Sequence, residues 1–272
     1  MTEKNMKYKV LAFDIDGTLT NSKKEITPDT REAILRAADM GCTIVIATGR
    51  PKKGAVKYAE ELKLSENGGY ILALNGGLLE RCSDSFALCK SVIDKSYYRE
   101  ICDMAAEYKV GLMTYDGDDV VSEDVDNKYL QIEARINGLG TKKVADLYEH
   151  LDYEVPKFLM LGDGDYLAEV EKKVKKRFEG RLDVYRSEPF FLEILPLNVN
   201  KASTLSKLLD YVGATRKELA AFGDGYNDIT MIEYAGMGVA MGNANDIVKA
   251  SADYVTRTND DGGIAYALSE LL

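Results

Sequence analysis

Two aspartates, Asp14 and Asp16, stand directly after the apolar run 8–13. Two carboxylates so close together repel each other, and a turn at this point needs only the pair Asp16-Gly17. Taken alone, the pair could simply belong to a polar turn between a strand and a loop. A calcium-binding loop is excluded, because Leu19 stands where such a loop requires glycine. The pair therefore points to a bound cation or to chemistry on a carboxylate.

A second acidic cluster follows another apolar run, at Asp224 and Asp228. Four aspartates brought into one partly desolvated site repel strongly unless a cation lies among them. The ligands on offer are carboxylate oxygens without sulfur or imidazole, and this set favours Mg²⁺ over Zn²⁺. We therefore expect Asp14, Asp16, Asp224 and Asp228 to surround a magnesium ion.

Two further segments have the chemistry of phosphate binding. Thr48 and Gly49 end an apolar run, where a hydroxyl and an approachable backbone N–H can contact a phosphate oxygen. Lys201 begins a predicted helix, whose positive end attracts anions. In a phosphate held there, Asp14 can attack phosphorus, while Asp16 can protonate the leaving group and then activate water. These residue types together predict phosphoryl transfer.

The elements that must position these residues alternate between strand and helix. Apolar runs predict buried strands at 8–13, 42–48 and 70–75, and amphipathic patterns predict helices at 27–41 and 51–64. Strands of this kind, joined by helices, are typical of a parallel sheet covered on both faces. The same alternation returns in the last quarter of the chain. The acidic clusters would then lie at the carboxyl ends of strands, where such sheets bind ligands.

The middle of the chain has a different pattern. Between 84 and 194, helices alternate with strand candidates such as 181–187 and 189–196, which indicate antiparallel pairs. We predict an α/β fold in which 1–83 and 195–272 form a doubly wound, Rossmann-like parallel sheet core. The segment 84–194 would be an inserted α+β cap domain.

Composition narrows the classes of function. The 272 residues carry a formal net charge of −10, which argues against bulk binding to nucleic acid or to an anionic membrane. No apolar run approaches the roughly 20 residues of a membrane-spanning helix, and the N-terminus does not read as a signal peptide. The four cysteines form no C-x-x-C pair. We therefore expect a cytoplasmic protein with reduced thiols.

The motifs resemble those of the haloacid dehalogenase-like hydrolases. DIDGTL (14–19), TGR (48–50), Lys201 and GDGYND (223–228) match the four motifs of that superfamily in order. The segments NGG, GMGVAMGNA, VKASADYVT and NDDGGIAYAL look like those of the Cof-type phosphatases of subfamily IIB. The place of the insert resembles the cap type called C2B. Two departures are visible, since Ala202 follows the motif lysine and the expected NGA reads NGG.

The resemblance implies a role for each matching position. Asp14 corresponds to the nucleophile and a metal ligand, and Asp16 to the general acid/base, with its backbone carbonyl on the metal. Asp224 corresponds to the third metal ligand and Asp228 to a supporting one. Four positions match phosphate-contacting residues: Thr48, Gly49, Lys201 and Asn227.

The hypothesis is a Mg²⁺-dependent phosphatase that hydrolyses phosphomonoesters of small metabolites through an aspartyl-phosphate. The resemblance suggests sugar phosphates, flavin mononucleotide or pyridoxal phosphate as substrates. A phosphomutase and a receiver-like signalling domain phosphorylated on Asp14 are alternatives that share the aspartyl-phosphate. We expect no nucleic-acid or membrane partner, and a monomer or small homo-oligomer.

Overall fold

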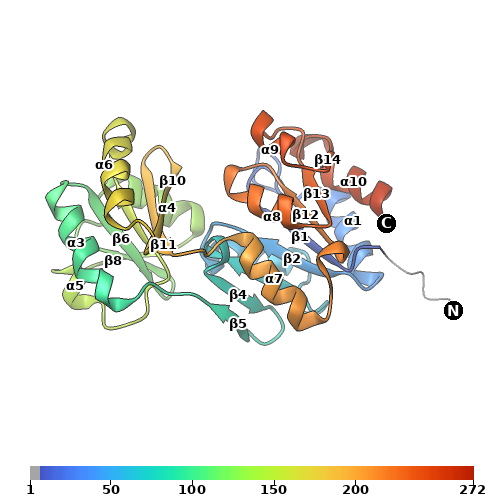
Figure 1. Cartoon of the computed structure of the whole chain (residues 1–272). Coiled ribbons are helices and arrows are strands. Elements are labelled where there is room, and N and C mark those ends of the chain that lie inside the picture. The colour runs from blue at the N-terminus through green and yellow to red at the C-terminus, as the bar shows by residue number, and fades with distance from the viewer. Residues whose placement is uncertain (1–6) are drawn as a thin grey trace. The chain divides into compact units, whose positions relative to one another are not determined.

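The computed structural model describes residues 7–272, which form two compact units (Figure 1). The core unit comprises the described chain up to Cys89 together with Asn200–Leu272, and the cap unit comprises Lys90–Val199. The predicted insert, 84–194, begins and ends a few residues earlier than the cap unit of the structure. The first boundary differs because the strands that follow residue 77 extend the core sheet before the chain enters the cap unit.

The core unit is built on an eight-stranded sheet of order β14-β13-β12-β1-β2-β3-β4-β5. Pairing is parallel from β14 through β3, and β4 joins β3 in the antiparallel sense. The strands are β1 (Val10–Phe13), β2 (Thr43–Ala47), β3 (Tyr70–Ala73), β4 (Leu78–Arg81), β5 (Ala87–Lys90), β12 (Leu219–Gly223), β13 (Met237–Ala240) and β14 (Tyr254–Val255).

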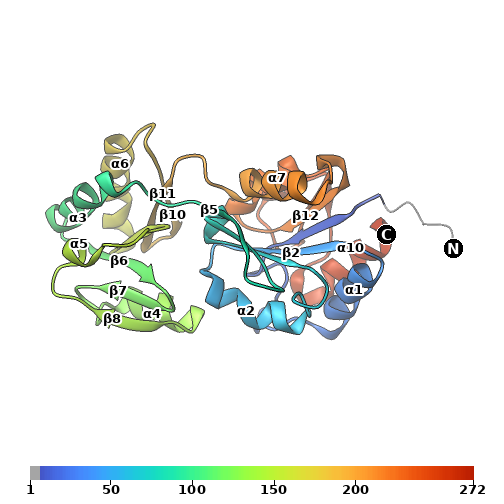
Figure 2. The same cartoon turned by 90° about the horizontal axis from the view of Figure 1, so that it is seen from below.

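Helices cover both faces of this sheet. Figure 2 shows α7 on one face and α1, α2 and α10 on the other. The core helices are α1 (Pro28–Asp39), α2 (Lys52–Glu61), α7 (Lys201–Val212), α8 (Ile229–Tyr234), α9 (Asp246–Ala250) and α10 (Gly263–Leu271). The central strands β1 and β12 are buried along their whole length, as their continuous apolar sequences predict. The predicted doubly wound fold is confirmed.

The cap unit has a six-stranded mixed sheet of order β10-β11-β9-β6-β7-β8. Its strands are β6 (Gly111–Asp116), β7 (Asp119–Ser122), β8 (Gly140–Lys143), β9 (Phe158–Leu161), β10 (Leu182–Glu188) and β11 (Phe191–Pro196). Its helices are α3 (Tyr98–Glu107), α4 (Lys128–Asn137), α5 (Leu147–His150) and α6 (Gly164–Arg177). Apolar residues of α3 and α6 pack with alternate residues of β9 and β11, such as Phe158 and Leu192, into the core of this unit.

The helices of the described chain are short. None of those within residues 7–272 is long and apolar enough to cross a membrane.

Candidate active site

The register of two neighbouring strands brings the acidic motifs together. Phe13 of β1 pairs with Phe222 of β12 in the parallel sense, so both strands end at the same edge of the sheet. Asp14 follows β1 directly and donates its backbone N–H to the carbonyl of Phe222 at 3.0 Å. Asp224 follows the last residue of β12. The two motifs, more than 200 residues apart in sequence, thus meet at the carboxyl ends of adjacent strands.

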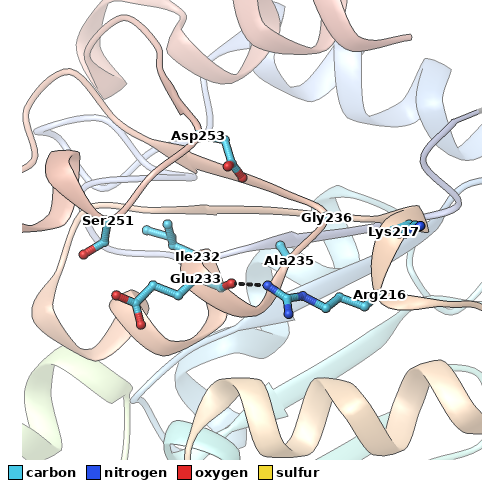
Figure 3. Close-up of a pocket in the computed structure, with 8 residues that line it drawn as sticks. All are labelled: Arg216, Lys217, Ile232, Glu233, Ala235, Gly236, Ser251 and Asp253. Atoms are coloured by element: carbon cyan, nitrogen blue, oxygen red, sulfur yellow. Dashed lines mark hydrogen bonds between the residues drawn. The ribbon is translucent and has the colours of Figure 1, made fainter.

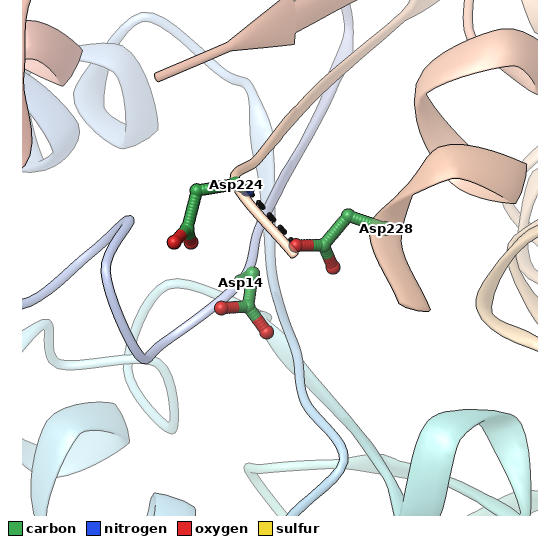
Figure 4. A group of neighbouring side chains, drawn as sticks. All are labelled: Asp14, Asp224 and Asp228. Atoms are coloured by element: carbon green, nitrogen blue, oxygen red, sulfur yellow. Dashed lines mark hydrogen bonds between the residues drawn. The ribbon is translucent and has the colours of Figure 1, made fainter. Parts of the chain in front are cut away.

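Three carboxylates gather at this edge (Figure 4). One oxygen from each of Asp14, Asp224 and Asp228 lies within 4.8 Å of the others. Asp14 and Asp228 are buried and Asp224 is partly buried. A compact group of oxygen donors of this kind fits a hard divalent cation. These three residues could hold the metal that the sequence predicts.

A buried lysine lies among these carboxylates. Lys201, at the start of α7, has no solvent exposure, and its Nζ donates to Asp14 Oδ1 at 2.6 Å and to Asp228 Oδ1 at 2.5 Å. Burial lowers the pKa of the lysine, but Asp14 and Asp228 outweigh this and raise the pKa to about 12. Lys201 is therefore charged and offsets part of the negative charge.

The pKa values of two carboxyl groups are raised, because they are buried and lie close to other negative charges. Burial, together with repulsion from Asp228, raises the pKa of Asp14 well above its usual range although Lys201 opposes the shift. Burial also raises the pKa of Asp224 to about 6, with a further contribution from Asp228 and an opposing hydrogen bond from Thr18. One lysine does not balance three carboxylates in a desolvated site. A divalent cation would supply the missing positive charge.

Asp228 also holds the loop that carries Asp224. Its Oδ2 accepts hydrogen bonds from the backbone N–H groups of Asp224 at 3.0 Å and Gly225 at 2.9 Å. The turn passes so close to this side chain that a Cβ at Gly223 would collide with it. The glycines of the GDGYND motif therefore permit a tight turn around a buried carboxylate.

Asp16 lies outside the cluster of three carboxylates. Arg50 grips its carboxylate through two hydrogen bonds, from Nε at 2.6 Å and Nη2 at 2.7 Å, and Lys24 Nζ adds a third at 2.7 Å. Burial would raise the pKa of Asp16, but Arg50 and then Lys24 lower it. The predicted contribution of Asp16 to the metal is its backbone carbonyl, which stays a prediction. Sequence reasoning did not find the pairing with Arg50 and Lys24.

Three of the four predicted phosphate-contacting residues, all except Lys201, lie beside Asn75. Asn227 donates to Asn75 Oδ1 at 3.0 Å, and a Cβ at Gly49 would lie 3.0 Å from the same oxygen. Thr48 is buried, and its hydroxyl accepts from the backbone N–H of Arg50 at 3.2 Å. Asn75 itself has a left-handed φ of 54°, a conformation that asparagine tolerates better than most residues. The sequence motifs included Asn75 only within the NGG segment and predicted no role for it.

The core unit has a separate pocket at the amino ends of its strands, and Figure 3 shows the residues that line it. Its lining includes segments that precede β12, β13 and β14, so it opens at the amino ends of these strands, away from Asp14 and Asp224. Arg216 donates to the backbone carbonyl of Glu233 there at 2.6 Å. The lining residues are Arg216, Lys217, Ile232, Glu233, Ala235, Gly236, Ser251 and Asp253. We do not assign the reaction to this pocket.

A doubly wound sheet whose strand ends gather carboxylates around a buried lysine is typical of enzymes that transfer phosphoryl groups. The chain belongs to the haloacid dehalogenase-like hydrolases, whose family model matches residues 11–268. The predicted family is therefore confirmed.

Three similar proteins define its place in that family. The 5-amino-6-(5-phospho-D-ribitylamino)uracil phosphatase YcsE of Bacillus subtilis is 34% identical, over 96% of this chain and 94% of that protein. A haloacid dehalogenase-like hydrolase from Bacteroides thetaiotaomicron, known from its crystal structure, is 42% identical with a TM-score of 0.92, covering 98% and 100% of the two chains. A solved sugar phosphatase of subclass IIB is 27% identical with a TM-score of 0.80, covering 96% and 98%. The chain is thus a haloacid dehalogenase-like phosphatase of the Cof type, subfamily IIB.

Proposed function

We propose that the protein hydrolyses phosphomonoesters of small metabolites with Asp14 as the nucleophile and Mg²⁺ as the cofactor. The observation that carries this proposal is the meeting of Asp14, Asp224 and Asp228 around the buried Lys201 at the carboxyl ends of β1 and β12. A nucleophilic carboxylate, a cation site and a fixed ammonium group are the parts that phosphoryl transfer to a carboxylate requires.

The cation site fits magnesium by its donor chemistry. Asp14, Asp224 and Asp228 would hold the ion, with the backbone carbonyl of Asp16 as a further oxygen ligand. When bound, magnesium would offset the negative charge of the phosphoryl group next to these carboxylates. Among the described residues, the group of possible metal ligands contains carboxylates and no imidazole.

Asp14 would attack phosphorus while the bond from phosphorus to the ester oxygen breaks. Lys201 favours the ionised form of Asp14 that this step needs, because its ammonium group lies 2.6 Å from the carboxylate and opposes the rise in pKa caused by burial and Asp228. Thr48, Gly49 and Asn227 would contact the phosphate oxygens, which orients the group for attack. The product of this step is an aspartyl-phosphate and a leaving alkoxide.

Asp16 would transfer protons in both halves of the reaction. It would first bind a proton, against the effect of Arg50 and Lys24 on its pKa, and give that proton to the leaving alkoxide; it would then take one from the water that attacks the aspartyl-phosphate and releases inorganic phosphate. Arg50 and Lys24 hold Asp16 in its ionised form in this structure, which is the form that the second half requires. Substrates with a good leaving group need the first proton least.

Phosphorylated sugars and sugar alcohols are the substrate class that we propose. The name of YcsE specifies a phosphorylated ribityl chain, and the solved subclass IIB relative is a sugar phosphatase. Phosphorylated cofactors remain in the proposed set. The cytoplasmic location and the monomeric or small homo-oligomeric state stay predictions of the sequence.

The test is the release of inorganic phosphate from a panel of phosphorylated metabolites, with and without Mg²⁺. We expect release only with the metal, and an Asp14→Asn variant that is inactive on every substrate. Full activity of that variant would contradict the proposal. Conversion of one sugar phosphate into an isomer without phosphate release would indicate the phosphomutase instead.

A further inference from the structure

The side chain of Asn243 contacts the acidic site from a separate loop after β13. Its Nδ2 donates to the backbone carbonyl of Gly17 at 2.8 Å and lies 3.4 Å from Asp224 Oδ2. Its Oδ1 accepts from the backbone N–H of Asn259 at 2.9 Å. An amide has two N–H donors and a carbonyl acceptor, so one side chain can make all three contacts. A carboxylate at this position could make only the last.

Asp224 is held from both sides by these loops. Thr18 donates its hydroxyl to Asp224 Oδ1 at 2.7 Å, while Asn243 approaches the other oxygen. Gly17 has a φ of +82°, and a Cβ there would collide with the Asp224 carboxylate. The carboxylate therefore has a donor near each oxygen and the backbone of Gly17 against it. These contacts fix its orientation toward the metal site that it would share with Asp14.

We propose that Asn243 is a positioning residue for the metal site: it orients the Asp224 carboxylate and ties it to the loop that follows Asp14. This inference rests on the proposed function, because it gives Asp224 its role as a metal ligand. Partners that orient a ligating carboxylate affect metal affinity strongly, by roughly 10–100-fold when they are removed.

The exposure of Asn243 separates this role from a structural one. Its side chain lies at the surface, where a lost hydrogen bond is replaced by water at little cost to folding. A residue that served only to hold the surface together would therefore leave metal affinity unchanged when truncated. A positioning residue would alter metal affinity while the stability of the metal-free protein stays the same.

The chain contains a matched control for loop tethering. Ser22, farther along the loop that follows Asp14, donates its backbone N–H at 2.8 Å and its hydroxyl at 2.5 Å to the carboxylate of Asp260. This pair ties the loop that follows Asp14 to Asp260, the residue next to Asn259, whose backbone N–H donates to Asn243. Neither Ser22 nor Asp260 has a described hydrogen bond to Asp224.

The experiment measures Mg²⁺ binding to the full chain by isothermal titration calorimetry, for the wild type, Asn243→Ala and Ser22→Ala. We expect Asn243→Ala to bind Mg²⁺ at least about tenfold more weakly and Ser22→Ala to bind it as the wild type does. Melting temperatures in EDTA verify that each variant is folded. Asn243→Leu, close in shape to asparagine but without donors, provides a second test and should match Asn243→Ala.

Two results would overturn the inference. Unchanged Mg²⁺ affinity in both Asn243 variants would show that the contact between Asn243 and Asp224 has no role in metal binding. Equal weakening in Ser22→Ala and Asn243→Ala would assign the effect to loop tethering alone. If the wild type itself binds no Mg²⁺, the metal-dependent function fails first and the inference fails with it, a result distinct from both of the others.

Discussion

Replacement of Asp14 by asparagine should make the metal-free protein more stable while it abolishes activity. The variant keeps the shape of the side chain and an oxygen for Lys201 but removes one of three clustered charges. Natural active sites often carry groups that oppose folding because the reaction needs them. The sign of the effect follows from the geometry of the cluster.

The charge on Asp14 is attracted by one neighbour and repelled by two. With an effective dielectric constant of about 20, the contact with Lys201 at 2.6 Å corresponds to about 6 kcal/mol of attraction. Repulsion from Asp224 and from Asp228, at separations within 4.8 Å, amounts to about 3 kcal/mol or more each. These opposing effects nearly cancel. Desolvation of a buried carboxylate then decides the balance, and it favours the neutral side chain by several kcal/mol.

We therefore expect Asp14→Asn to raise the free energy of unfolding in EDTA by about 1–3 kcal/mol. The assay is equilibrium unfolding in urea, followed by circular dichroism. Added Mg²⁺ should stabilise the wild type more than the variant, because binding to the folded state adds stability in proportion to affinity. An exposed control, Asp39→Asn, should change stability by at most about 0.5 kcal/mol. A variant less stable than the wild type in EDTA would refute the reasoning.

Three further substitutions follow from the same structure. Lys201→Met leaves two carboxylates without their buried cation and should cost about 3–5 kcal/mol of stability in EDTA, measured by urea unfolding; an unchanged midpoint would contradict the ion-pair assignment. Gly17→Ala places a side chain in the left-handed backbone conformation against Asp224, so it should lower the free energy of unfolding by about 1–2 kcal/mol and abolish most of the phosphatase activity. Wild-type activity of this variant would contradict the need for glycine at this position. Hydrogen bonds from Lys9 and from the adjacent Thr215 lower the pKa of Glu218 from 4.5 to about 2, so its contribution to stability is present above pH 4.5 and lost as the pH falls toward 2. The difference in melting temperature between wild type and Glu218→Gln should therefore shrink over that pH range, and a constant difference would refute this explanation.

The sequence predicted the frame of the site because its signals are local. Continuous apolar runs such as 8–13 identify buried parallel strands, and the ends of such strands must share an edge of the sheet. The meeting of Asp14 with Asp224 follows from that rule. Lys201 was expected at a helix start near an anion, and it does begin α7. Its complete burial between Asp14 and Asp228 was not expected, because burial depends on how the helix packs.

Pairings between distant side chains could not be predicted from the same signals. Nothing in the sequence joins Asp16 to Arg50, or Asp224 to Asn243, since each contact depends on loop conformations outside regular elements. The strands β4 and β5 also escaped notice. They are the last two strands of the core sheet, and their sequences mix polar and apolar residues, so no long apolar run predicts them. That is why the predicted insert begins too early to include β5 in the core unit.

The claim that Asp14 is the nucleophile is tested most directly by trapping its phosphorylated form. An aryl phosphate with a good leaving group needs no proton from Asp16, whereas hydrolysis of the aspartyl-phosphate needs Asp16 to accept a proton from the attacking water. An Asp16→Asn variant mixed with such a substrate and Mg²⁺, then quenched in acid, should carry one added phosphoryl group on the peptide that contains Asp14, as measured by mass spectrometry. The group should be absent from the double variant Asp14→Asn, Asp16→Asn. Release of the aryl alcohol without any phosphoryl group on Asp14, or with the group on another residue, would contradict the account.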